Sequence, residues 1–155
     1  MIRKRVLFVC LGNICRSPMG EFRFRQLVEE NGLSAYFESA SAATSSEETG
    51  NPVYPPARRL MMAHGIDCSA KRARQLTAAD YRDFHLLLGM DRANIRDMKR
   101  ICGGDPDHKI HLLLDIVPDH PRTEVADPWF TGNFEAAWQD IDAGCRAWLE
   151  RLLEK

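Results

Sequence analysis

A continuous apolar run at residues 5–10 (RVLFVC) constrains the fold of this chain more than any other segment. A strand with apolar side chains at successive positions is buried on both faces, which is typical of parallel sheets covered by helices. A second, weaker strand is expected at residues 37–42, and apolar runs at 85–90 and 110–114 predict two more; longer segments of helical periodicity separate these strands. This alternation predicts an α/β fold in three layers, with a central four-stranded parallel sheet and helices on both faces.

The segments between these runs carry start and stop signals of helices. Ser17 and Pro18 predict an N-cap and a first helical position, and Gly32 predicts the end of that helix. Further helices are expected at residues 55–65, 91–102 and 132–153. Apolar residues of the last helix recur at steps of four and three, which predicts a face packed in the core. These residues are Phe134, Trp138, Ile141, Cys145, Trp148 and Leu152.

Size and charge exclude several classes of protein. The 155 residues are 45% hydrophobic and 28% charged, which predicts a single domain, residues 1–155, able to build its own core. Lys and Arg number 21 and Asp and Glu 22, so we expect no nucleic-acid partner held by bulk charge and no polybasic membrane anchor. No run approaches the roughly 20 apolar residues of a membrane span.

The five cysteines predict neither disulfides nor a metal site. They lie at positions 10, 15, 68, 102 and 145, an odd number with no Cys-x-x-Cys pair. A secreted disulfide framework and a structural zinc site both call for other spacings. The apolar stretch near the first residues is too short for a signal peptide. We therefore expect a reduced, cytoplasmic protein with no metal and no cofactor.

The segment with the clearest chemistry is residues 9–18 (VCLGNICRSP), where the first strand turns into a helix. Ligands of open α/β sheets bind at the carboxyl ends of strands. A tight loop before a helix directs backbone N–H groups and the positive end of the helix dipole at one point, which makes an anion cradle. The loop is not a Walker A site, because it lacks the terminal Gly-Lys pair.

Two side chains of this loop define the expected reaction. Cys10 lies where the helix dipole and a nearby guanidinium favour a thiolate, and Arg16 offers a planar fork that matches two phosphate oxygens. Gly12 and Asn13 tolerate the positive φ that such a loop requires. Ser17 can cap the helix and donate its hydroxyl to the sulfur.

Residues 9–17 (VCLGNICRS), the pair Asp127-Pro128 and the order of the elements resemble the low-molecular-weight protein tyrosine phosphatases over essentially the whole chain. The resemblance implies that Cys10 is the nucleophile and forms a phosphocysteine. It implies that Arg16 and the loop stabilise the phosphoryl oxygens, and that Asp127 is first general acid and then general base. The loop residues expected to contact substrate are Leu11, Gly12, Asn13, Ile14 and Cys15.

The sequence also supports Asp127 without the resemblance. It precedes a proline and then Trp129 and Phe130, whose rings can form an apolar wall for a flat substrate and shield the acid from water. Asp115 and Asp119 are the competitors, and neither has aromatic neighbours of this kind.

The resemblance implies a supporting network as well. It would order the loop through Asn13, Ser17, Ser41 and His64. Cys15 corresponds to a second loop cysteine that can trap oxidised Cys10 as a reversible disulfide, which predicts redox sensitivity.

One position departs from the family pattern. Where many relatives have an aromatic residue in the loop after the second strand, this chain has Glu47 beside Glu48. We therefore expect a negative lip in place of one stacking wall, weaker binding of aryl phosphates and discrimination against acidic phosphopeptides.

The predicted function is metal-independent hydrolysis of protein phosphotyrosine and small aryl phosphates. The expected partner is a phosphotyrosine protein, with a bacterial-type tyrosine kinase as the opposing enzyme, and we expect a monomer. Two alternatives share the fold: a thiol-coupled arsenate reductase, for which Cys68 and Cys102 lack the relay spacing, and a protein arginine phosphatase, against which Ile14 argues. A phosphoprotein-binding module without catalysis is a third, and the presence of Asp127 argues against it.

Overall fold

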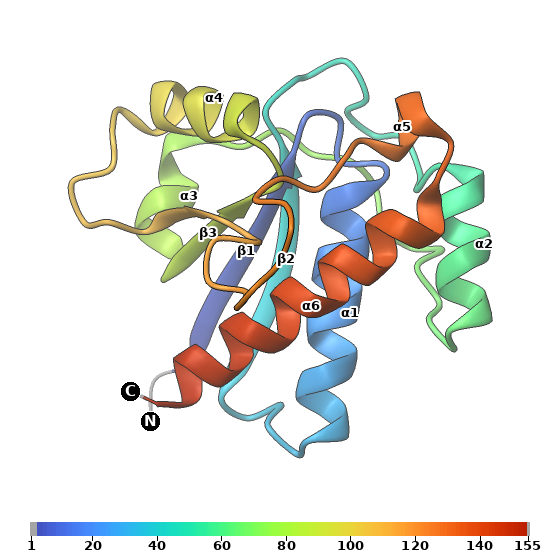
Figure 1. Ribbon diagram of the computed structural model, residues 1–155. Coiled ribbons are helices and arrows are strands. Elements are labelled where there is room, and N and C mark those ends of the chain that lie inside the picture. The colour runs from blue at the N-terminus through green and yellow to red at the C-terminus, as the bar shows by residue number, and fades with distance from the viewer. Residues whose placement is uncertain (1–2, 155) are drawn as a thin grey trace.

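The computed structural model describes residues 3–154 and shows strands and helices in alternation (Figure 1). The strands are β1 (Lys4–Cys10), β2 (Phe37–Ala43), β3 (Leu86–Gly89) and β4 (Ile110–Leu112). The helices are α1 (Arg16–Glu30), α2 (Pro55–Ala63), α3 (Ala78–Asp83), α4 (Arg92–Cys102), α5 (Pro128–Thr131) and α6 (Phe134–Leu153).

The four described strands form one parallel sheet in the order β2-β1-β3-β4, as the alternating pattern predicts. β1 pairs with β2 on one side and β3 on the other, and its residues from Val6 to Cys10 are all buried. Cys10 therefore reaches the carboxyl end of the sheet from one of its two central strands.

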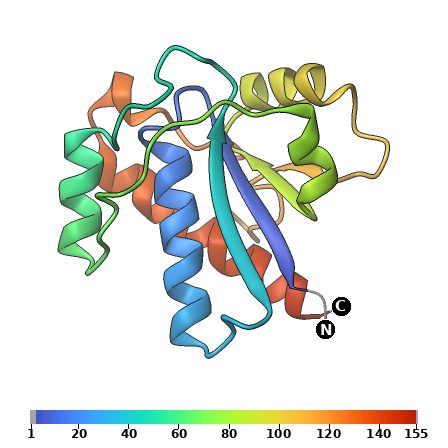
Figure 2. The same cartoon turned by 180° about the vertical axis from the view of Figure 1, so that it is seen from behind.

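Helices cover both faces of the sheet, which confirms the three-layer prediction (Figures 1 and 2). Val6 and Phe8 pack in a core with α1, α2 and α6, and Leu7 and Val9 pack in a second core with α3 and α4. Gly20 permits the close approach of α1, because a Cβ atom there would lie 2.6 Å from the Phe8 ring.

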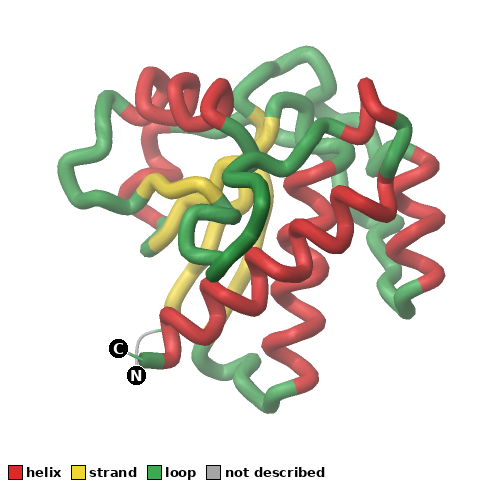
Figure 3. Tube along the Cα trace, in the orientation of Figure 1, coloured by secondary structure: helices red, strands yellow, loops and turns green. Residues whose placement is uncertain are grey.

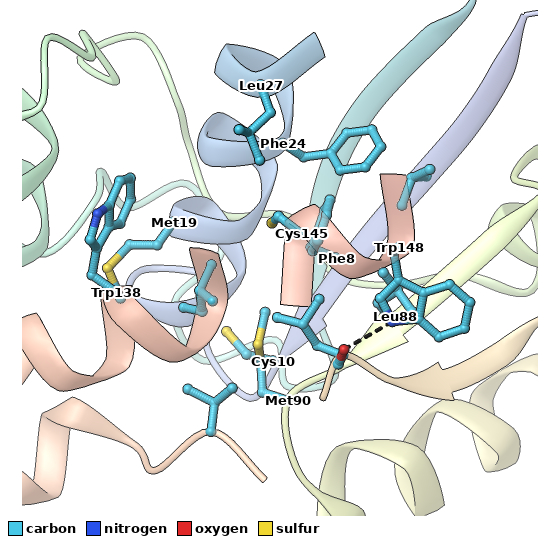
Figure 4. Close-up of a cluster of buried hydrophobic side chains, with 14 of the residues drawn as sticks. Phe8, Cys10, Met19, Phe24, Leu27, Leu88, Met90, Trp138, Cys145 and Trp148 are labelled. Carbon is cyan, nitrogen blue, oxygen red and sulfur yellow. Dashed lines mark hydrogen bonds between the residues drawn. The ribbon is translucent and has the colours of Figure 1, made fainter. Parts of the chain in front are cut away.

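The apolar stripe of α6 faces the first core, as predicted (Figure 4). Trp138, Cys145 and Trp148 are buried, and the Trp148 indole Nε1 donates to the Leu113 carbonyl at 2.9 Å. That bond satisfies a buried polar atom that would otherwise oppose packing of the indole.

Two short helices were not predicted, and one predicted cap is wrong. α3 is too short for a helical period, and its start is set by a capping box between Thr77 and Asp80. α5 is a single turn whose first amide groups bond to Asp127. The N-cap of α1 is Cys15, so Ser17 lies inside the first turn and makes no cap.

The loops that follow the strands gather at one end of the sheet (Figure 3). The loop after β1 and the loop after β2 lie side by side there, since the Thr44 and Ser45 amides donate to the Cys10 and Leu11 carbonyls. No helix within residues 3–154 is long and apolar enough to cross a bilayer.

Candidate active site

The loop of residues 11–15 joins β1 to the start of α1. Its Leu11 and Ile14 carbonyls accept from neighbouring segments, from Ser45 N at 3.0 Å and from Tyr54 N at 2.9 Å. The N–H groups of Gly12, Ile14 and Cys15 have no acceptor among the residues that the structure describes. A ring of N–H donors at the start of α1 is an anion-binding arrangement.

Three donors converge on the sulfur of Cys10. The Ser17 hydroxyl lies 3.0 Å from Sγ, and the amides of Asn13 and Ser17 donate to it at 3.3 and 3.4 Å. Asn13 holds φ at +60°, as the sequence predicts, and this turns its amide toward the sulfur. Gly12 does not have a positive φ, so that part of the prediction is wrong.

A chain of hydrogen bonds links the sulfur to a buried carboxylate. The Asn13 Nδ2 group donates to Ser17 Oγ at 2.7 Å and to Ser41 Oγ at 3.0 Å. Ser41 in turn donates its hydroxyl to Glu21. The orientation of the Asn13 amide is fixed from the other side, where Oδ1 accepts from Arg74 N at 3.1 Å.

The direction of each hydrogen bond in this chain follows from two groups: the Glu21 carboxylate, which can only accept, and the Asn13 Nδ2 group, which can only donate. An ionised carboxylate can only accept, so Ser41 must donate to it and must accept from Asn13. Asn13 then uses both amide hydrogens as donors, and Ser17 accepts one of them. The single hydroxyl hydrogen of Ser17 is left for Cys10, where it stabilises negative charge on sulfur.

Two cations lie beside the Glu21 carboxylate. The carboxylate is buried, and it lies 2.8 Å from Arg25 Nη2 and 3.5 Å from Lys71 Nζ. Lys71 also donates to the Ser41 carbonyl at 3.0 Å. Burial lowers the pKa of Lys71, and the negative charge of Glu21 opposes that shift.

His64, expected in this network, lies outside it. Its imidazole is on the exposed surface, stacked on Trp138 with ring centroids 4.9 Å apart. Glu21 and Lys71 contact Ser41 instead. The helix that ends near His64 packs its buried side chains, Ala57 and Met61, away from the loop.

Arg16 is buried and held by three groups. Its Nη1 donates to Asp91 Oδ2 at 2.8 Å and to the Val125 carbonyl at 2.9 Å, and Nη2 donates to Asp127 Oδ2 at 3.3 Å. Burial alone would lower the pKa of Arg16, but the negative charges of Cys10, Asp127 and Asp91 raise it. The guanidinium is therefore a fixed cation beside the sulfur.

Asp127 lies across the loop from Cys10 at the start of α5. Its Oδ1 accepts from the Trp129 amide at 3.0 Å while Oδ2 faces Arg16. The segment before it is tied to α6, because buried Asp140 binds His120 Nε2 at 2.9 Å and Arg122 Nη2 at 3.1 Å. The competing acids Asp115 and Asp119 are exposed and do not line the hollow described next.

These groups surround a hollow of about 240 Å³, which we call the catalytic hollow. Every predicted catalytic and substrate-contacting residue lines it except Asn13, whose side chain turns inward to the network. Trp129 and Phe130 form its rim, 51% and 79% exposed, and Glu47 lies on the lip as predicted. The lining residues are Cys10, Leu11, Gly12, Ile14, Cys15, Arg16, Ser45, Glu47, Glu48, Asp127, Trp129 and Phe130.

The other cysteines differ from Cys10 in their surroundings. Burial and the neighbouring charges of Cys10 and Asp127 raise the pKa of Cys15 to about 12, so it is a neutral thiol in the same hollow. Cys68 and Cys102 lie in cores on opposite faces of the sheet. Within residues 3–154 no cluster of His, Cys, Asp and Glu has the arrangement of a metal site.

Three residues of the site were missed in the sequence. Asp91 was expected only as a helix cap, which it is, but its second oxygen holds Arg16. Its place directly after an apolar strand is a signal that could have found it. Glu21 and Lys71 gave no signal, since charged residues on a helix and in a loop are usually exposed.

Comparisons with known proteins give one consistent result. Residues 5–155 match the family model described as low molecular weight phosphotyrosine protein phosphatase. The chain is 40% identical to the low molecular weight protein-tyrosine-phosphatase YfkJ of Bacillus subtilis, over 95% of this chain and 94% of that one. It is also 40% identical to the human low molecular weight phosphotyrosine protein phosphatase, over 96% and 95% of the two chains.

Solved structures extend the similarity to the fold. The crystal structure of YfkJ superposes with a TM-score of 0.96 at 37% identity, covering 99% of this chain and 97% of that one. A Drosophila protein described as an arginine phosphatase superposes with a TM-score of 0.86 at 29% identity, covering 95% and 96% of the two chains.

Proposed function

Because the chain belongs to the low-molecular-weight phosphotyrosine protein phosphatase family, we propose that it hydrolyses protein phosphotyrosine through a phosphocysteine on Cys10. The observation that supports this most directly is the convergence of Cys10, Arg16 and Asp127 on one hollow. A nucleophile, a fixed cation and an acid around one anion site are the parts that phosphoryl transfer needs.

In the first step the Cys10 thiolate attacks phosphorus and the bond from phosphorus to the phenolic oxygen breaks. Arg16 and the loop N–H groups stabilise the charge that spreads over the phosphoryl oxygens. Asp127, protonated at this stage, gives its proton to the leaving phenolate. The aromatic rim of Trp129 and Phe130 contacts the phenyl ring.

In the second step water attacks the phosphocysteine and the phosphorus–sulfur bond breaks. Asp127, now ionised, takes a proton from that water, and inorganic phosphate and the thiolate are released. In both steps Arg16 and the loop amides stabilise the negative charge on the phosphoryl oxygens, so the proposed reaction uses no metal and no cofactor. The whole of residues 1–155 serves as the phosphatase domain in this proposal.

We also propose that Cys15 protects Cys10 from irreversible oxidation. Both thiols line the catalytic hollow, and a sulfenic acid on one condenses with a neighbouring thiol. Catalysis requires a reduced thiol, which fits a protein of the cytoplasm. We propose further that the protein opposes a bacterial-type tyrosine kinase and acts as a monomer.

The test is hydrolysis of para-nitrophenyl phosphate in chelator near pH 5–6. We expect turnover that disappears in Cys10→Ser and falls ~10²–10⁴-fold in Asp127→Ala, as loss of a general acid requires. Asp115→Ala is the matched control, because its carboxylate lies outside the hollow. Full activity of Cys10→Ser would exclude the proposal.

Two further assays distinguish the proposed phosphotyrosine phosphatase from a protein arginine phosphatase and from an arsenate reductase. Ile14 contributes an apolar wall to the hollow, which fits a phenyl ring better than a guanidinium group, so we expect a phosphotyrosine peptide to be hydrolysed faster than a phosphoarginine peptide. Cys68 and Cys102 are buried or partly buried in separate cores and cannot pass a disulfide outward from the loop. We therefore expect no arsenate-dependent consumption of thiols.

A further inference from the structure

A second hollow, of about 540 Å³, adjoins the catalytic hollow and is not used by the proposed reaction. The two share Ile14, Glu48 and Trp129, so one opens beside the other. We call the second hollow the flank groove. Its other lining residues are Asn51, Pro52, Val53, Tyr54, Pro55, Arg58, Arg59 and Met62.

The floor of the flank groove is rigidly tied to the catalytic loop. The Tyr54 amide donates to the Ile14 carbonyl, and the Tyr54 ring packs on Trp129 with centroids 4.6 Å apart. On its other side Tyr54 stacks on Phe134 at 6.0 Å. Tyr54 thus connects the catalytic loop with the rim of the catalytic hollow. A surface fixed in this way can hold the chain of a bound substrate in one position.

The far wall of the flank groove is basic. Arg58 and Arg59 lie on α2 with exposed side chains, and neither forms an ion pair with another residue in the part of the chain that the structure describes. The carboxylate of Glu48 is turned to Asn51, whose Nδ2 donates to it at 2.7 Å. Met62, 58% exposed, adds an apolar surface one turn beyond Arg58.

The lip of the catalytic hollow also carries an acidic residue outside the flank groove. Glu47 is exposed, lines the catalytic hollow and does not line the flank groove. A peptide that enters the flank groove from the catalytic hollow would therefore pass Glu48, which both hollows share, and reach two positive charges, whereas a peptide that leaves over Glu47 would meet a negative charge.

We propose that the flank groove binds the peptide segment on one side of the phosphotyrosine and selects an acidic side chain there through Arg58 and Arg59. This inference depends on the proposed function for the position of the phosphotyrosine. An extended chain spans ~3.3–3.6 Å per residue, so residues two to four places from the phosphotyrosine lie ~7–14 Å away, within reach of a groove that starts at the rim. Acidic residues of a chain that leaves over Glu47 would meet a like charge.

The experiment compares kcat/KM for a neutral phosphotyrosine peptide with peptides that carry Glu two to four residues before, or two to four residues after, the phosphotyrosine. We expect a gain on one side only, about two- to fivefold for each exposed ion pair at low salt. The gain should disappear in 1 M NaCl, where the Debye length falls to ~3 Å.

Charge reversal identifies the residues responsible. Arg59→Glu should abolish the preference for Glu and create a preference for Lys at the same peptide position, and Arg58→Glu should act in the same direction. Arg82→Glu is the matched control, since Arg82 is an exposed helical arginine outside both hollows and should leave peptide selectivity unchanged.

Two readouts separate this inference from the proposed function. Para-nitrophenyl phosphate is too small to reach the flank groove, so its turnover reports on the catalytic hollow alone. If the parent hydrolyses it and yet cleaves all the peptides at equal rates, the flank groove does not select a peptide. The same conclusion follows if Arg82→Glu changes selectivity as much as Arg59→Glu. Absence of turnover with any substrate would refute the proposed function instead.

Discussion

Ser41 donates its hydroxyl to Glu21 and accepts an amide hydrogen from Asn13. Asn13 Nδ2 can only donate, so Ser17 accepts from it and keeps its own hydrogen for Cys10, while Glu21 anchors the far end of the chain through Ser41. The nucleophile is thus supported from behind the loop as well as by Arg16.

We predict that Glu21→Gln slows the reaction of Cys10. A neutral amide binds the Ser41 hydroxyl more weakly than a carboxylate does, so Ser41 holds Asn13 less firmly and the Ser17 hydroxyl is less well placed at the sulfur. Loss of one hydrogen bond of about 0.5–1.5 kcal/mol corresponds to a roughly 2–12-fold lower rate. The rate of alkylation of Cys10 by iodoacetamide measures the effect.

The control for that prediction is Glu29→Gln, an exposed carboxylate farther along α1. It should leave the alkylation rate unchanged. Equal rates in Glu21→Gln and the parent would show that Glu21 does not support the nucleophile through Ser41 and Asn13.

We predict that Asp91→Asn weakens phosphate binding and leaves helix α4 intact. Asn keeps an oxygen that can accept from the Asn94 amide, so the N-cap survives. Arg16 loses a charge-assisted bond worth about 1.5–3 kcal/mol, so the inhibition constant of inorganic phosphate should rise at least tenfold. A large fall in melting temperature with no change in that constant would contradict the role given to Asp91.

Much of the fold could be predicted because its signals are local. The apolar run of β1 predicts a buried strand, and the apolar stripe of α6 predicts a helix face packed in the core. Both patterns lie within short stretches of the sequence. α5 could not be predicted, since its single turn depends on Asp127 accepting the Trp129 amide. The same applies to α3, whose six residues span less than two turns.

The residues that surround the anion site could be predicted from one loop, but the residues that hold them in place could not. Cys10, Arg16 and Ser17 lie within eight residues of one another, so their proximity follows from a tight turn. Lys71 reaches Ser41 across thirty positions, and only the tertiary fold decides that it, and not His64, takes that place. Asp91 meets Arg16 across seventy-five positions for the same reason.

We predict that recovery from peroxide depends on Cys15 and on pH. Peroxide oxidises the Cys10 thiolate to a sulfenic acid, and attack by Cys15 forms the disulfide and releases water. Since the pKa of Cys15 is raised to about 12, its thiolate is scarce and disulfide closure should accelerate with pH between 6 and 9. Mass spectrometry of the quenched protein measures the closure.

In Cys15→Ala a second equivalent of peroxide can oxidise the unprotected sulfenic acid to an irreversible sulfinic acid, so the variant should regain less activity with thiols than the parent does. Cys68→Ala is the control, because Cys68 is buried in the core away from the catalytic hollow. Recovery of Cys15→Ala to the level of the parent would show that Cys15 does not protect the nucleophile.

We predict that the stabilisation by Asp105 is complete above about pH 4 and is lost progressively as the pH falls further. Burial would raise the pKa of Asp105, but hydrogen bonds from the Tyr81 hydroxyl at 2.7 Å and the Lys109 and Ile110 amides lower it below its ordinary 3.8. The folded state therefore holds the proton less tightly than the unfolded chain. The stabilisation is complete above the unfolded pKa and is lost as the pH falls through the folded value.

Asp105→Asn should cost about 1 kcal/mol at pH 7, a fall of ~2–4 °C in melting temperature for a chain of this size. The difference from the parent should shrink as the pH is lowered from 5 through 3.5, which thermal unfolding at a series of pH values measures. Asp107→Asn, in the same turn, is the control, because only the backbone amide of Asp107 contacts Tyr81. A difference that stays constant over this pH range would mean that Asp105 acts through its shape and not its charge.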